Sequence, residues 1–125
     1  RVKIVIGAVT VVDAVREAAK ARARREVALY LPVVADLDPT VQIAPELLAK
    51  LRVAAERYDF ATAAALISDD LLAKFAFAGN PDDLVAHTER LFAAGANRVE
   101  FGTPHGLTPE DGLRLLGEKV LPALS

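Results

Sequence analysis

The sequence predicts an α/β fold in which helices outnumber strands. Two segments, residues 2–12 and 98–101, are rich in β-branched or aromatic side chains and have the pattern of strands. The remainder carries the capping residues and apolar spacing of five or six helices. Because two parallel strands alone make no stable sheet, the chain is expected to form part of a larger sheet or barrel.

The first strand is nearly continuous in its hydrophobicity, which is typical of a parallel strand covered on both faces. Asp13 follows it and is predicted to cap a helix over residues 14–31. The polar face of this helix is basic and includes Arg16, Lys20 and Arg24. We expect a solvated helix surface there, with phosphate binding as the alternative.

The middle of the chain is predicted to be helical. Pro32 is expected to close or kink the first helix, and residues 35–44 are expected to form a loop. Three helices follow, over residues 45–58, 60–67 and 69–77, and Asp59 and Ser68 have the character of caps for the last two.

The last third is predicted to form helix, strand and helix. Asn80 should cap a helix over residues 82–94, and Gly95 should end it. The strand at 98–101 and a helix over 109–124 complete the chain. We therefore expect one segment over residues 1–125, with a strand at about 2–12, a helical insertion at about 13–78 and a helix–strand–helix unit at about 81–124.

The loop after the second strand is the strongest candidate for a binding site, because barrels of alternating strands and helices carry their chemistry at the carboxyl ends of strands. His105 and Thr103 are its candidate polar contacts, and Gly102 and Gly106 would permit close approach of a ligand. Thr10 lies near the end of the first strand. The structural alternatives are a histidine bonded to backbone, glycines needed for loop geometry and a threonine packed in the core.

Composition excludes several classes of protein. The chain has 125 residues, 53% hydrophobic and 26% charged, with a net charge of −2, which argues against disorder and nucleic-acid binding. Cysteine is absent, and the two histidines lack a zinc-binding spacing, so no metal site is expected. Its apolar runs are shorter than the roughly 20 residues of a membrane helix. We expect a cytoplasmic protein without membrane contact, and no catalytic residue is assigned from the sequence.

Four motifs resemble a known family. AGNPDD (78–83) is similar to the turn before the last crossover helix of luciferase-like flavin and deazaflavin oxidoreductases, and AGANRVEFG (94–102) is similar to the stop and eighth strand of that family. YLPVV (30–34) and FGTPHG (101–106) resemble the branch of methylenetetrahydromethanopterin reductases that use coenzyme F-420. The resemblance covers essentially the whole chain, but only the C-terminal part of the family's proteins.

This resemblance implies the C-terminal quarter of a (β/α)8 barrel, whose full form takes about 250 residues. It also implies hydride transfer between a reduced deazaflavin, coenzyme F-420, and a pterin-type or other small substrate, in a homo-oligomer. The isolated segment is expected to be inactive. An FMN-dependent luciferase-like monooxygenase is the first alternative. The second is a non-catalytic, truncated fragment that self-associates.

Overall fold

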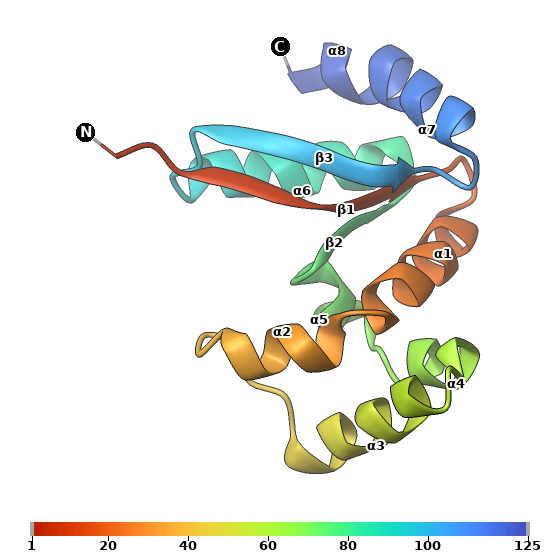
Figure 1. Ribbon diagram of the computed structural model, residues 1–125. Coiled ribbons are helices and arrows are strands. Elements are labelled where there is room, and N and C mark those ends of the chain that lie inside the picture. Colours follow the sequence, from red (N-terminus) through yellow and green to blue (C-terminus); the bar gives the residue numbers. More distant parts are fainter. Residues whose placement is uncertain (1, 125) are drawn as a thin grey trace.

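We analysed a computed structural model of the chain, which describes residues 2–124. Helices and strands alternate only in part, because a run of five helices separates the first two strands (Figure 1). In order, the elements are β1 (Val5–Val12), α1 (Arg16–Ala28), α2 (Leu31–Leu37), α3 (Pro45–Glu56), α4 (Phe60–Ala65), α5 (Asp69–Ala73), β2 (Ala76–Gly79), α6 (Pro81–Ala93), β3 (Arg98–His105), α7 (Pro109–Leu115), the π-helical turn η1 (Leu116–Val120) and α8 (Leu121–Leu124).

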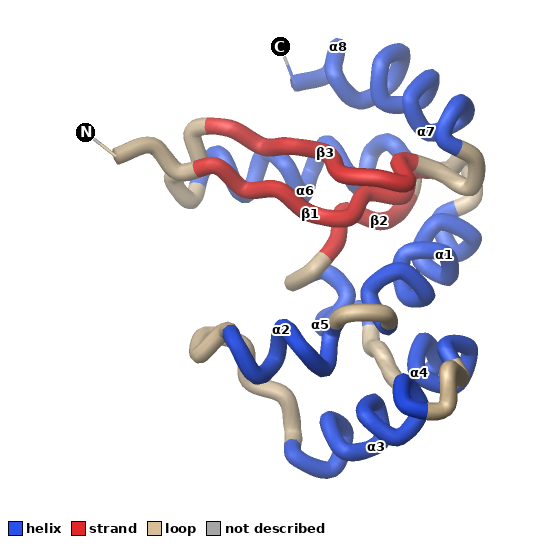
Figure 2. The backbone as a smooth tube through the Cα atoms, viewed as in Figure 1, coloured by secondary structure: helices blue, strands red, loops and turns tan. Residues whose placement is uncertain are grey.

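The three strands form one parallel sheet with β1 in the centre (Figure 2). On one side, the second half of β1 pairs with β2, and Val9 lies beside Ala76. On the other side β1 pairs with β3 from its first residue, where Val5 lies beside Arg98. The strand order is therefore β2-β1-β3, which differs from the order of the strands along the chain.

Helices cover both faces of this sheet. Val9 and Val11 belong to a core that includes the buried alanines of α1, whereas Ile6, Ala8 and Val12 belong to a second core with α6 and η1. Side chains that alternate along β1 thus enter different cores, as a strand buried on both faces requires. α1 on one face and α6 on the other lie in the crossovers between these parallel strands.

The long excursion between β1 and β2 forms a separate helical layer. In Figure 1, α2 to α5 lie below the sheet, on the far side from α7 and α8. α1 joins this layer to the sheet through buried side chains that include Ala23, Val27, Leu51 and Ala63. None of the helices in the described part of the chain has the length and hydrophobicity needed to cross a membrane.

The expected α/β fold with a small parallel sheet is present, but the structure adds a third strand. Residues 69–77 were expected to form one helix, whereas α5 ends at Ala73 and β2 begins at Ala76. Short apolar runs do not distinguish strand from helix, and here the free edge of β1 decides the outcome. Similarly, Pro32 does not simply end a helix, because it lies in the first turn of α2, where its missing N–H is harmless.

The first half of β1 is less buried than its sequence predicts. Val11 and Val12 are inaccessible to solvent, whereas Val5 is 52% exposed and Ile4 is 50% exposed. α1 packs on one face of β1, but it covers only the second half of the strand, where Val9 and Val11 belong to the same core as the helix. The uncovered face of the β1–β3 pair therefore carries the apolar Val5 beside Arg98, which forms an ion pair with Glu100.

Candidate functional site

The carboxyl ends of β1 and β3 form the most favourable place for a binding site. From β1 the chain passes to α1 on one face of the sheet, and from β3 it passes to α7, which belongs to the core of the other face. In open α/β sheets, ligands bind where the connections of two neighbouring strands diverge in this way. The loop predicted from the sequence lies at this edge.

A β-bulge shapes the end of β3. Val9 lies beside Gly102 and Val11 beside His105, so a step of two residues along β1 corresponds to a step of three residues along β3. The peptide bond between Thr103 and Pro104 is cis. Bulges bend a strand and redirect its side chains, and they are common beside active sites. β3 is consequently longer than the predicted 98–101 and extends through the loop to His105.

His105 is half-buried and bonded within its own strand. Its Nε2–H donates to the carbonyl oxygen of Phe101 at 3.0 Å, because a carbonyl can only accept. In the neutral ring this leaves Nδ1 as an acceptor. His105 has a backbone φ of 76°. This left-handed conformation is uncommon for residues other than glycine, and such residues cluster at functional sites. The bond to Phe101 matches the structural alternative given in the sequence analysis, a histidine bonded to backbone. Nδ1 is the ring atom that would accept a hydrogen bond from a ligand.

The glycines of the loop allow close packing of backbone on backbone. A Cβ at Gly102 would lie 2.7 Å from the carbonyl oxygen of Ala8, and one at Gly106 would lie 2.6 Å from the Cα of Gly112. A Cβ at Gly112 would lie 2.2 Å from the carbonyl carbon of His105. The start of α7 therefore rests directly on the loop, and it holds His105 in place.

The two threonines differ in exposure. Thr103 is exposed at the rim of the loop. Thr10 is completely buried, and its hydroxyl donates to the carbonyl oxygen of Ala8 at 3.2 Å. Of the two hydroxyls, only that of Thr103 is accessible from solvent.

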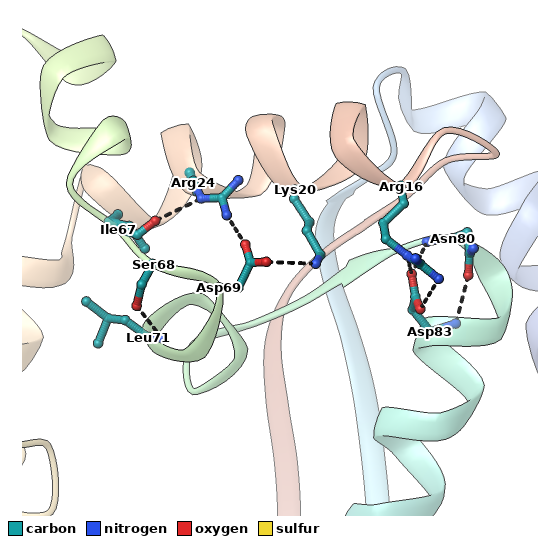
Figure 3. Close-up of polar contacts among 9 residues, drawn as sticks. All are labelled: Arg16, Lys20, Arg24, Ile67, Ser68, Asp69, Leu71, Asn80 and Asp83. Carbon is teal, nitrogen blue, oxygen red and sulfur yellow. Dashed lines mark hydrogen bonds and ion pairs between the residues drawn. The ribbon is translucent and has the colours of Figure 1, made fainter.

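A polar network missed by the sequence analysis joins α1 to α5 and α6 (Figure 3). Arg16, Lys20 and Arg24 lie four residues apart on α1, and each bonds a carboxylate from another element. Arg16 pairs with Asp83 at the start of α6, whereas Lys20 and Arg24 pair with Asp69 of α5. The face expected to be solvated instead ties α1 to two helices. The four-residue spacing was the available signal, but it did not reveal the distant partners.

The expected caps are present at three helix starts. Asp59, Ser68 and Asn80 each accept a hydrogen bond from a backbone N–H in the first turn. Asp13 does not cap α1 as predicted, since the helix begins at Arg16 and the Asp13 carboxylate accepts from Val15 N at 2.8 Å. The backbone N–H of Asp13 donates to Gly79 O at 3.1 Å, which joins the loop after β1 to the end of β2.

No family model matches the chain. Several known proteins do match it, and the three described below share one name. A 5,10-methylenetetrahydromethanopterin reductase from Methanopyrus kandleri is 39% identical over 64 residues, 51% of this chain and 18% of its own length. The reductase of Archaeoglobus fulgidus is 29% identical over 53% of this chain and 20% of its own length, and that of Methanolobus tindarius is 26% identical over 85% of this chain and 34% of its own length.

A solved structure extends this similarity to nearly the whole chain. The coenzyme F-420-dependent tetrahydromethanopterin reductase from Methanopyrus kandleri matches 98% of this chain and 36% of its own, with a TM-score of 0.82 and 26% identity. The resemblance predicted from the four sequence motifs is confirmed. The chain spans only about a fifth to a third of the length of the relatives it matches.

Proposed function

We propose that the chain is the C-terminal part of a coenzyme F-420-dependent methylenetetrahydromethanopterin reductase of the luciferase-like type. The observation that carries the proposal is the match over 98% of the chain, at a TM-score of 0.82, to a reductase of this description. The 39% identity over 64 residues to a methylenetetrahydromethanopterin reductase of the same organism supports it from the sequence.

The strand arrangement is compatible with the end of a (β/α)8 barrel. Consecutive barrel strands lie side by side, parallel and joined by an outer helix, as β1 and β3 do with α6 between them in the chain. β2 departs from this order because it lies on the far side of β1. On this proposal β1 and β3 are the last two barrel strands, and β2 belongs to the insertion that follows β1.

The described residues fit one part of a deazaflavin or pterin site. The loop at the carboxyl end of β3 presents an exposed hydroxyl from Thr103 and the Nδ1 acceptor of His105, which suit the polar edge of an uncharged ring. When bound, the reduced deazaflavin supplies the hydride that reduces the substrate. The chain's own contribution is to hold and orient these rings, because Gly112 and the Phe101 carbonyl fix the position of His105.

A second candidate function follows from the uncovered face of β1. If the 125 residues act alone, the exposed Val5 on the uncovered face of β1, with the neighbouring Val2 and Ile4, would favour self-association without coenzyme. In the full-length reductase, the rest of the barrel would cover this face. The homo-oligomer expected from the resemblance is a separate proposal for the full-length protein.

Spectroscopy of the full-length protein distinguishes the two functions. We expect the purified protein to bind coenzyme F-420, and addition of methylenetetrahydromethanopterin to oxidise the reduced coenzyme, which restores its visible absorbance. FMN is the control ligand, because the alternative monooxygenase would bind it in preference. A protein that binds neither ring, or that oxidises reduced FMN instead, would contradict the proposal.

A further inference from the structure

A pocket beside the outer edge of β2 is not used by the proposed reaction. It has a volume of about 210 Å³ and lies between α1, α5, β2 and α6. β2 is an edge strand in the described part of the chain, so this edge has backbone groups without a strand partner. β2 lines it with two small side chains, those of Ala76 and Ala78.

Each carboxylate that lines this pocket is paired with a cation. Lys20 from α1 and Arg90 from α6 line it together with Asp69 and Asp83, and Arg16 and Arg24 bond those two carboxylates from behind. Arg16 holds Asp83 through two hydrogen bonds, of 2.7 and 3.0 Å (Figure 3). Each carboxylate therefore has an arginine partner from α1 that is not among the lining residues, and Lys20 and Arg90 are the cations that line the pocket.

The side chains of the pocket that remain to contact a ligand are hydrogen-bond donors. Lys20 Nζ donates to Asp69 at 3.2 Å, and an ammonium group has further N–H bonds to give. Arg90 is exposed and forms no ion pair with any described residue. His87 lies one turn before Arg90 in the chain, lines the same pocket and stacks on Phe77 with ring centroids 4.7 Å apart.

We propose that this pocket binds a phosphate group, either free inorganic phosphate or a small phosphate monoester. A phosphate dianion would be attracted by Lys20 of α1 and Arg90 of α6, and it would accept hydrogen bonds from both and from His87. The volume accommodates a phosphate with little else attached, so the ligand is not a whole coenzyme. The inference does not depend on the proposed reductase activity.

The imidazole of His87 gives a second readout. Burial lowers the pKa of His87, and repulsion by Arg90 lowers it further. A bound phosphate would stabilise the imidazolium, so the pKa of His87 should rise and binding should tighten as the pH falls. The charged groups around the ring are Lys20, Asp69, Asp83 and Arg90 in the pocket, with Asp38 and Lys74 in the adjoining cavity.

Calorimetric titration of the full-length protein tests the proposal. Inorganic phosphate and ribose 5-phosphate are the two ligands, ribose is the blank, and Arg90→Gln is the variant. Loss of one charged donor should weaken phosphate binding about tenfold or more. Arg25→Gln on α1 is the matched control, because Arg25 is exposed and outside the pocket, and it should leave the affinity unchanged.

Binding of either ligand, weakened in Arg90→Gln and accompanied by a raised His87 pKa in NMR titration, would support the proposal and identify the source of the phosphate. The proposal would be overturned if no binding is detected at phosphate concentrations up to about 10 mM, or if Arg90→Gln binds phosphate with the same affinity as the parent. Because coenzyme binding is not measured, failure here would leave the proposed reductase activity intact.

Discussion

Arg16 and Asp83 are 67 residues apart in the chain, and their side chains meet through two parallel hydrogen bonds. The Oδ2 atom of Asp83 also accepts from the backbone N–H of Asn80 at 2.9 Å, and the side chain of Asn80 accepts from Asp83 N at 2.9 Å. One carboxylate thus closes the capping box of α6 and anchors the start of α1. Bidentate geometry gives such a pair more specificity than a single surface contact.

Asp83→Ala should therefore destabilise the fold. The variant loses half of the capping box and the partner of Arg16, which together are worth about 1 to 2 kcal/mol at a partly exposed site. Asp82→Ala is the matched control, since Asp82 lies in the same first turn and has no hydrogen bond or ion pair with a described residue. Urea titration measures both, and equal midpoints for the two variants would contradict the assigned role.

The same carboxylate should make stability depend on pH in the acid range. Burial alone would raise the pKa of Asp83, but hydrogen bonds from the Arg16 side chain and the Asn80 backbone outweigh it and lower the pKa below its usual value. Its stabilisation is fully present above the unfolded pKa of about 4, and it is lost as the pH falls through the lower, folded pKa. Urea midpoints across this range should fall less steeply in Asp83→Ala than in the parent.

Local signals in the sequence predicted the helix starts well. Asn80, Asp59 and Ser68 were identified because a cap depends on the residue and its own first turn. The motifs around residues 78–83 and 101–106 pointed to the right relatives for the same reason, since each combines turn geometry with a following helix.

Distant partners were the part that the sequence could not reveal. β2 is four residues long and exists because the edge of β1 accepts it, which no local pattern encodes. The cations of α1 have the spacing of an ordinary solvated face, and only the fold brings Asp69 and Asp83 opposite them. The bulge at Thr103 likewise depends on pairing with β1.

Two glycines of the C-terminal helices should respond in opposite ways to alanine. At Gly112 a Cβ would lie 2.2 Å from the carbonyl carbon of His105, so Gly112→Ala must displace the loop and should cost several kcal/mol. At Gly117 a Cβ would meet no described atom within 4 Å outside its own helix, so Gly117→Ala should be neutral or stabilise by roughly 0.5–1 kcal/mol. Thermal unfolding of both variants tests the contact between α7 and the loop, and similar melting temperatures would argue against it.

The isolated 125-residue chain should self-associate. Val2, Ile4 and Val5 are 89%, 50% and 52% exposed, and the neighbouring edge of β1 has unpaired backbone groups that another strand can use. Val5→Lys should reduce association, because it replaces an exposed apolar side chain of β1 by a charged one. Light scattering at tens of micromolar is the measurement. A clean monomer mass for the unmodified chain would count against the partial-barrel interpretation.

His105 gives the prediction closest to function, and two substitutions in the full-length protein separate its possible roles. His105→Gly and His105→Ala both remove the ring and its bond to the Phe101 carbonyl, which is worth roughly 0.5–1.5 kcal/mol. Only glycine adopts a φ of 76° freely. In His105→Gly the relief of backbone strain should therefore offset the lost hydrogen bond, and this variant should remain nearly as stable as the parent.

If the ring contacts coenzyme or substrate, both variants should lose turnover or substrate affinity to a similar extent, even though their stabilities differ. If His105 serves only to shape the loop, His105→Gly should retain normal kinetics, because glycine maintains the backbone that the loop and Gly112 require. Steady-state kinetics and urea midpoints measured on the same two proteins decide between these outcomes. Normal turnover in His105→Gly would remove the histidine from the site and leave Thr103 as the loop's exposed polar side chain.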